Sequence, residues 1–156
     1  MGKYIYLGFF LAIALLMTSM LVVNHGTNTA NMQEIDTGVK TAVIGQMRNS
    51  DTGADDYGMR AKDTVALITS EVTSNLSKIN KIATIDFKLF KDEEGKQPLN
   101  YDTAISTNAI VKSVQYRVNI YNTKDVMINA SGQTVIKSNA QAESSTENRI
   151  VLDKNI

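Results

Sequence analysis

The chain has 156 residues, a length that suits one domain or one domain with an appendage. Its 16 basic and 16 acidic side chains cancel, which argues against a nucleic-acid-binding protein because such proteins usually carry a basic excess. The absence of cysteine excludes disulfide frameworks, thiol catalysis and cysteine-ligated zinc. The single histidine cannot build a multi-histidine metal site.

An uncharged apolar segment lies near the start of the chain. Between Tyr4 and Val23, 17 of the 20 residues are apolar, and a helix of this length spans about 30 Å, the thickness of a bilayer's hydrocarbon core. Lys3 precedes the segment and the next charged residue is Glu34, so the positive-inside rule keeps the N-terminus in the cytoplasm and exports the rest. We therefore predict that residues 1–25 form a cytoplasmic stub and a transmembrane anchor in contact with membrane lipid.

Two other interpretations of this segment are open. A cleaved signal peptide has an apolar core of about 7–15 residues and a small-x-small cleavage site. The present segment is longer, and Leu21 to Val23 lead into Asn24 and His25 without such a site, which favours a retained anchor. A buried helix of a soluble protein is the other alternative, but so small a chain offers little surface to cover it. His25 is interpreted as an interfacial polar residue, with a pH-sensing role as the alternative.

A second apolar pattern follows the anchor at helical spacing. It consists of Met32, Ile35, Val39, Ala42, Val43 and Met47. We predict that the anchor continues into an amphipathic helix, which packs either within its own domain or against copies of itself or a partner. Gly38 and Gly45 are seven residues apart on nearly one face of that helix. They would let another helix approach closely, as would Gly8 in the anchor.

A polar loop and a second helix complete the predicted helical region, residues 26–81. Residues 49–58 contain two glycines and three aspartates, and their spacing does not fit a calcium-binding EF-hand loop, so we predict a solvated turn rather than a metal site. The second helix is predicted over residues 61–80 from positions that step by four and three: Ala61, Val65, Ile68, Val72, Asn75 and Ile79. The loop is long enough for the two helices to run antiparallel.

The spacing of apolar residues changes to two in the last region, residues 82–156. Alternation predicts strands over residues 85–90 and 114–121, shorter strands over Val126–Ala130 and Arg149–Leu152, and a longer one over Gln133–Glu143. Ser131-Gly132 indicates a hairpin turn. The predicted fold class is therefore α+β, with two helices followed by an antiparallel sheet of about four strands.

Sequence patterns typical of catalysis are absent. There is no phosphate-binding glycine loop and no Gly-x-Ser-x-Gly elbow. The carboxylate pairs Asp55–Asp56 and Glu93–Glu94 lie in polar turns, whereas catalytic carboxylates need a partly dry site that separates their pKa values. We predict no catalytic, cofactor-binding or metal-ligating residues, and hence no enzyme.

The order of a cytoplasmic stub, an uncharged helix, an amphipathic helix and an antiparallel sheet resembles pilins and pseudopilins. The closest resemblance is to the small pilin-like proteins of tight-adherence pili. In these families the apolar helix anchors the subunit and later forms the filament spine. A prepilin has a glutamate five residues after its cleavage-site glycine. Leu7 follows Gly2 at that spacing and Ile13 follows Gly8. The resemblance therefore implies an accessory subunit that stays in the membrane.

The expected function is that of a single-pass structural subunit of the cell membrane, with its C-terminal domain outside. It would be a pilin-like accessory component of a surface filament, secretion, DNA-uptake or conjugation machine. Its partners would be lipid and other membrane or filament subunits, including copies of itself, but not nucleic acid. The alternative is a membrane-tethered module that binds or senses a ligand or a cell-wall component. An envelope protein of a phage or mobile element is a further alternative.

Overall fold

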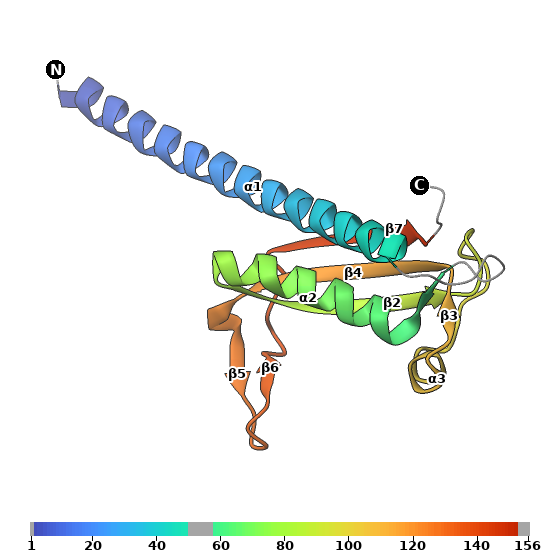
Figure 1. Cartoon of the computed structure of the whole chain (residues 1–156). Helices are drawn as coiled ribbons and strands as arrows, with labels where there is room; N and C mark the ends of the chain where they lie inside the picture. Colours follow the sequence, from blue (N-terminus) through green and yellow to red (C-terminus); the bar gives the residue numbers. More distant parts are fainter. Residues whose placement is uncertain (1, 50–57, 153–156) are drawn as a thin grey trace. The chain divides into compact units, whose positions relative to one another are not determined.

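The computed structural model describes residues 2–49 and 58–152, and within the first helix it describes the side chains of residues 13–20, 26, 27 and 29–47 (Figure 1). The chain divides into two compact units, residues 1–31 and residues 32–156. The second unit is a mixed α+β unit with antiparallel sheets, as the apolar patterns predict. The polar loop predicted at residues 49–58 lies mostly outside the described residues.

The first helix, α1, extends from Gly2 to Asn49. Its last part belongs to the second unit, where Met32, Ile35, Val39, Val43 and Met47 of the predicted stripe are buried in the hydrophobic core and Ala42 is half-buried. Residues 32–47 of α1 thus bury one side and expose the other. They pack within their own unit, which is the first of the two arrangements that the pattern allows.

The second helix, α2, extends from Ala61 to Ile79 and buries Ile68, Val72 and Leu76 against the same core. Asn80 ends it in the left-handed conformation, with φ 52°, which asparagine tolerates better than most residues. Because this cap reverses the chain at once, strand β2 begins at Lys81, four residues before the alternation in the sequence becomes visible.

The central sheet consists of β2 (Lys81–Phe90), β4 (Ser113–Asn122) and β7 (Ser144–Val151), all antiparallel, with β4 in the middle. Phe87 lies opposite Tyr116, and Val118 lies opposite Thr146. One face of β4 is buried throughout, through Val114, Tyr116, Val118 and Ile120. This face shares one core with the apolar stripes of α1 and α2.

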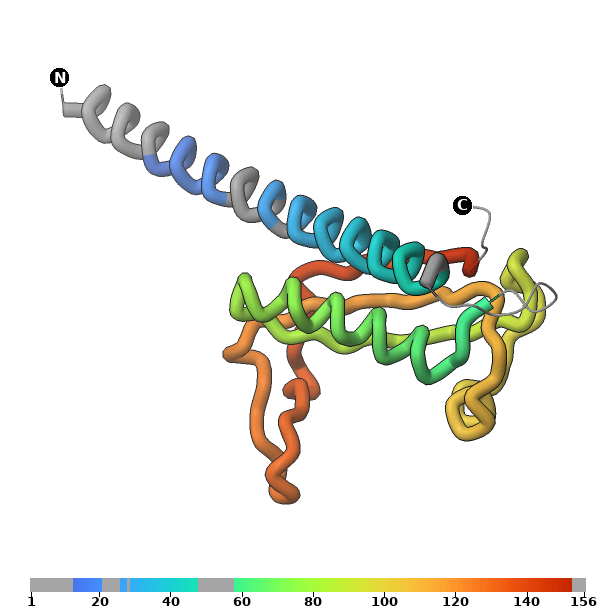
Figure 2. The backbone as a smooth tube through the Cα atoms, viewed as in Figure 1, coloured from blue at the N-terminus to red at the C-terminus, as the bar shows by residue number. Residues whose placement is uncertain are grey.

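Short elements are inserted between the strands of this sheet. Helix α3 (Tyr101–Thr107) follows β2, and β3 (Ile110–Val111) pairs with β1 (Met59–Arg60). After β4, the 3₁₀ turn η1 (Thr123–Asp125) leads to β5 (Val126–Ile128), which pairs only with β6 (Thr134–Ile136). Figure 2 shows this hairpin as a separate projection between β4 and β7.

The prediction of one long strand over Gln133–Glu143 is wrong. Strand β6 ends at Ile136, a turn bonds the Ala140 amide to the Lys137 carbonyl, and the last strand begins at Ser144 rather than Arg149. The physical reason is that residues 138–142 alternate only small and polar side chains. These bury too little apolar surface to hold a strand in a sheet.

The predicted anchor is described only in part. Within the described residues, no helix is both long and apolar enough to cross a membrane. The side chains of residues 1–12 and 21–25, which include Gly8 and His25, lie outside the described set. The anchor therefore stays a prediction from the sequence.

Candidate functional site

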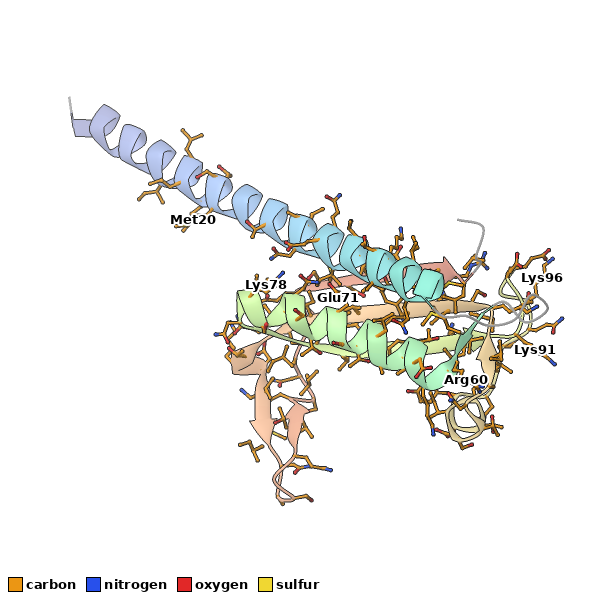
Figure 3. The ribbon with its side chains drawn as sticks, viewed as in Figure 1. Met20, Arg60, Glu71, Lys78, Lys91 and Lys96 are labelled. Carbon is orange, nitrogen blue, oxygen red and sulfur yellow. The ribbon has the colours of Figure 1, made fainter. Side chains whose placement is uncertain are left out.

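Part of α1 presents a row of uncovered apolar side chains. Leu15, Leu16, Met17 and Met20 have exposed fractions of 62%, 63%, 65% and 74%. The hydroxyl of Thr18 donates to the carbonyl oxygen of Ala14 at 3.0 Å and that of Ser19 donates to the carbonyl oxygen of Leu16 at 2.9 Å, so both polar side chains in this stretch are satisfied by their own helix. What remains is an apolar surface that water solvates poorly, of the kind that marks an interaction site or a lipid contact. Figure 3 labels Met20 on this stretch.

The glycines predicted to pack helices differ in their surroundings. A methyl group added to Gly38 would lie 2.8 Å from Oε1 of Glu71 and 3.2 Å from Nδ2 of Asn75, so α1 and α2 approach closely there. A methyl group on Gly45 would have no heavy atom within 4 Å. Gly38 therefore serves the contact between α1 and α2, whereas Gly45 lies in open space.

Polar side chains follow the seam between α1 and α2. Nδ2 of Asn75 donates to Oε1 of Glu71 at 3.2 Å, and Nζ of Lys78 donates to Oδ1 of Asn75 at 2.9 Å. Lys78 also lies 3.7 Å from the Glu34 carboxylate, so the contacts at Glu34 and at Gly38 together make the helices antiparallel. Figure 3 shows Glu71 and Lys78 on α2 along this seam. Asn75, the polar residue among the positions that predicted α2, is buried in this seam and hydrogen-bonded there.

A carboxylate joins α1 to the sheet. Oδ1 of Asp36 accepts a hydrogen bond from the Tyr116 hydroxyl at 3.1 Å, and Oδ2 accepts one from the Thr146 hydroxyl at 3.2 Å. Burial first, and then the negative charge of Asp36, raises the pKa of Tyr116 far above its usual value. The phenol is therefore a permanent donor. This bonded cluster fixes how far along the sheet α1 lies and which side of the helix faces it.

A second carboxylate clamps one end of the sheet. Glu143 lies 2.5 Å from Nζ of Lys81 at the start of β2 and accepts a hydrogen bond from Nδ2 of Asn122 at 3.1 Å. The hydrogen bond from Lys81 is the main cause that lowers the pKa of Glu143. On the outer face of the sheet, Arg117 similarly pairs with Glu147 and lowers its pKa. Both groups connect neighbouring segments of the sheet.

The charged turn after β2 lines an open cleft, but the carboxylate of Asp92 in this turn is bonded to the turn's own backbone. Asp92 accepts hydrogen bonds from the amides of Lys96 and Gln97 at 2.9 and 2.7 Å, and the bond from Lys96 is the main cause that lowers its pKa. Glu94 receives the Arg149 guanidinium at its backbone carbonyl oxygen. Lys91 and Lys96 lie on this turn in Figure 3. Among the described residues, no three acidic or histidine side chains gather as metal ligands would.

Exposed apolar residues on the β5–β6 hairpin were not among the predicted interaction sites. Met127 and Ile128 are 49% and 75% exposed. The sequence does hold a signal, because three consecutive apolar residues, Val126–Ile128, place apolar side chains on both faces of a strand. The exposure of Met127 and Ile128, which point to opposite faces of β5, shows that neither face is fully covered by a second layer.

Comparison of the chain with models of protein families, with curated proteins and with solved structures finds no match.

Proposed function

We propose that this protein is a single-pass, membrane-anchored structural subunit whose α+β unit lies outside the cell membrane. It would serve as a pilin-like accessory component of a surface filament, secretion, DNA-uptake or conjugation machine. The observation that carries the proposal is the row of exposed apolar side chains at residues 13–20, on the same helix whose residues 32–47 belong to the core of the α+β unit.

Covering the exposed apolar side chains of this row with an apolar medium would lower the free energy of the chain. Burying a leucine or methionine side chain gains about 1.5–3 kcal/mol, so covering the exposed two thirds of Leu15, Leu16, Met17 and Met20 would gain about 4–8 kcal/mol. Lipid and the helices of neighbouring subunits are the two media that supply this. The uncharged stretch from Tyr4 to Val23 extends the row to the length of a bilayer core, which supports the proposed anchor.

The polar clusters of the α+β unit support a structural role. Asp36 ties α1 to two strands, and Glu143 ties β2 to the end of β4. Both carboxylate oxygens of Asp92 accept hydrogen bonds from the amides of its own turn. Asp36 and Glu143 thus stabilise junctions between elements and Asp92 stabilises a turn, as a subunit that must hold its shape within an assembly requires.

The topology can be tested with single-cysteine variants because the natural chain contains no cysteine. We expect Ser131→Cys, at the exposed tip of the β5–β6 hairpin, to react with a membrane-impermeant maleimide on intact cells. Gly2→Cys should react only after lysis, and both chains should remain in the membrane pellet after an alkaline wash. Protection of Ser131→Cys in intact cells, or a chain that appears in the soluble fraction, would refute the anchored topology.

The assembly part of the proposal has its own test. The full chain, purified from its native membrane in mild detergent, should co-isolate with another membrane component or with further copies of itself. A monodisperse monomer with no membrane partner would contradict a subunit role. In that event the tethered binding or sensing module becomes the better interpretation.

A further inference from the structure

The β5–β6 hairpin is an uncovered arm. A two-stranded hairpin is marginally stable on its own, because only a third strand or a packed layer buries its apolar side chains. Residues 126–136, which we call the arm, contain no charged side chain, and β5 pairs with β6 only. Met127 and Ile128 are 49% and 75% exposed on it. The outer edge of β5 therefore carries both free backbone groups and uncovered apolar side chains.

A groove of matching chemistry lies along the outer edge of β2, whose other edge pairs with β4. The end of this outer edge is already covered, because Phe90 forms a bridge with Pro98 and the Leu99 amide donates to the Leu89 carbonyl oxygen at 2.8 Å, so the free part lies before Leu89. The groove's apolar side chains come from the face of β2 that packs against α2. Asp86, which points to the opposite face of the strand, also lines it, so the groove must lie at the strand's edge. We call this the edge groove; it is lined by Val65, Thr69, Thr73, Ala83, Ile85, Asp86, Phe87 and Tyr101.

In the described part of the second unit, the exposed large apolar side chains lie at these two places. Among the described residues from 32 to 152, the large apolar side chains that are exposed are Tyr101, Met127 and Ile128. Tyr101 stacks on Phe87 with ring centroids 6.4 Å apart, at the wall of the edge groove, and the other two lie on the arm. One surface therefore has the chemistry to cover the other.

The arm and the groove of one chain are separate places on the sheet, with the arm at the start of β2 and the groove along residues 83–87. The arm leaves β4 beside the start of β2, where Asn122 lies opposite Lys81, and the groove extends toward α3. Figure 1 shows the hairpin and α3 at the two ends of the sheet. A contact between an arm and a groove joins two different surfaces, so the arm of one copy can dock on a second copy while its own groove stays open to the arm of a third.

We propose that the arm of one copy docks in the edge groove of a second copy, with β5 extending the sheet at the outer edge of β2. Strand addition of this kind gains affinity from backbone hydrogen bonds and specificity from alternate side chains in pockets. The net charges are opposite, because the groove's charged side chain is Asp86, whereas the base of the arm carries Lys124, Asp125 and Lys137 and so has one positive charge in excess. This contact goes beyond the proposed function, since it involves only the second unit and needs no membrane.

Cysteine cross-linking of the full chain in detergent tests the contact on a background without native cysteines. Ile128→Cys and Tyr101→Cys chains, carrying tags of different size, are mixed and oxidised. We expect a disulfide-linked dimer with one chain of each kind, and a ladder of multimers from the double variant. The control pair is Ile128→Cys with Ser145→Cys, whose side chain is exposed on the outer face of β7; it should give no mixed dimer.

A second set of variants separates docking from folding. Met127→Asp should abolish the cross-link between Ile128→Cys and Tyr101→Cys, because it places a charge in the contact. Ser131→Asp, exposed at the tip of the same arm, should leave the cross-link intact. The far-UV circular dichroism of both variants should match that of the parent.

Several results would overturn the proposal. The first is a yield of mixed dimers from Ile128→Cys and Tyr101→Cys that is no higher than the yield from Ile128→Cys and Ser145→Cys. The second is a dimer that joins two Ile128→Cys chains, and the third is a cross-link that Met127→Asp leaves unchanged. A ladder from a chain that proves not to be membrane-anchored would refute the proposed topology and leave the arm contact standing. An anchored chain that gives neither the mixed dimer nor the ladder would support the proposed topology and refute the arm contact.

Discussion

The hydrogen bond between Asp36 and Tyr116 makes a quantitative prediction about how α1 is held on the sheet. Tyr116→Phe removes one donor from a carboxylate that keeps its bond from Thr146, so we expect a loss of about 1.5–3 kcal/mol of unfolding free energy, the usual value for a bond to a charged group. Asp36→Ala leaves the buried Tyr116 hydroxyl without this acceptor. It should cost at least as much as the loss of one bond, because an unsatisfied buried group adds about 1–3 kcal/mol.

A double-mutant cycle isolates the bond itself. If Asp36→Ala and Tyr116→Phe act through the same contact, the double variant should be less destabilised than the sum of the single variants, with a coupling energy of about 1.5–3 kcal/mol. The measurement is urea unfolding of the full chain in detergent, followed by far-UV circular dichroism and fitted with a common m-value. Tyrosine fluorescence serves as a second probe, since the chain has no tryptophan.

The control and the refuting result are both specific. Thr146→Val removes the other bond to Asp36, and its effect should persist in the Tyr116→Phe background. Strictly additive effects of Asp36→Ala and Tyr116→Phe, with a coupling energy below about 0.5 kcal/mol, would show that the bond does not hold α1 on the sheet.

Three further predictions concern burial, helix packing and pH. Ile35→Ala should destabilise the α+β unit by about 2–5 kcal/mol in urea unfolding, whereas Leu16→Ala, on the exposed row, should change it by less than about 0.5 kcal/mol. Gly45→Ala, in open space, should raise the unfolding free energy by about 0.5–1 kcal/mol, and Gly38→Ala by clearly less because its methyl group meets α2 at 2.8 Å. The pKa of Glu143 is lowered in the folded state, so its ionised carboxylate stabilises the fold above its unfolded pKa, and this stability is lost as the pH falls. The difference in Tm between the parent and Glu143→Gln should therefore shrink on acidification from neutral pH to about pH 3.

Each of these predictions has a result that contradicts it. Equal losses for Ile35→Ala and Leu16→Ala would place the exposed row in the same core as the stripe. An equal gain at the two glycines would mean that α2 does not approach α1 at Gly38. A difference at Glu143 that grows toward acid pH would have the wrong sign for a lowered pKa.

The elements with long, regular periods were predictable. The helical part of the core stripe and the whole of α2 repeat their apolar positions over several turns. Strand β4 alternates over its full length because one face is buried. Helix α3 was missed because its seven residues are too few to show a period. The local signals were present, since Asn100 caps its first turn by accepting from the Thr103 amide and Asn108 ends it at φ 50°.

The contacts that hold the unit together could not be predicted in the same way. Asp36 and Thr146 are 110 residues apart in the chain and meet only because α1 lies on the sheet in one rotation and at one register. Gly38 and Gly45 lie on nearly one face by helical periodicity, yet only Gly38 meets α2, because the distance between two packed helices changes along their length. Periodicity assigns faces of elements, and it does not assign the partner or the depth of each contact.

The hairpin makes the same point for interaction surfaces. Apolar side chains at Val126–Ile128 satisfy the rule for a buried strand as well as the rule for an uncovered one, because a run of apolar residues does not say whether a second layer lies above it. The exposed fractions of Met127 and Ile128 decide this, and the topology adds that β5 pairs with β6 alone among the described strands and that β2 leaves its outer edge free as far as the Phe90–Pro98 bridge. A free strand edge beside exposed apolar side chains is an aggregation liability unless another strand or a partner covers it. In a chain that is proposed to assemble, the same uncovered surfaces can join one copy to the next.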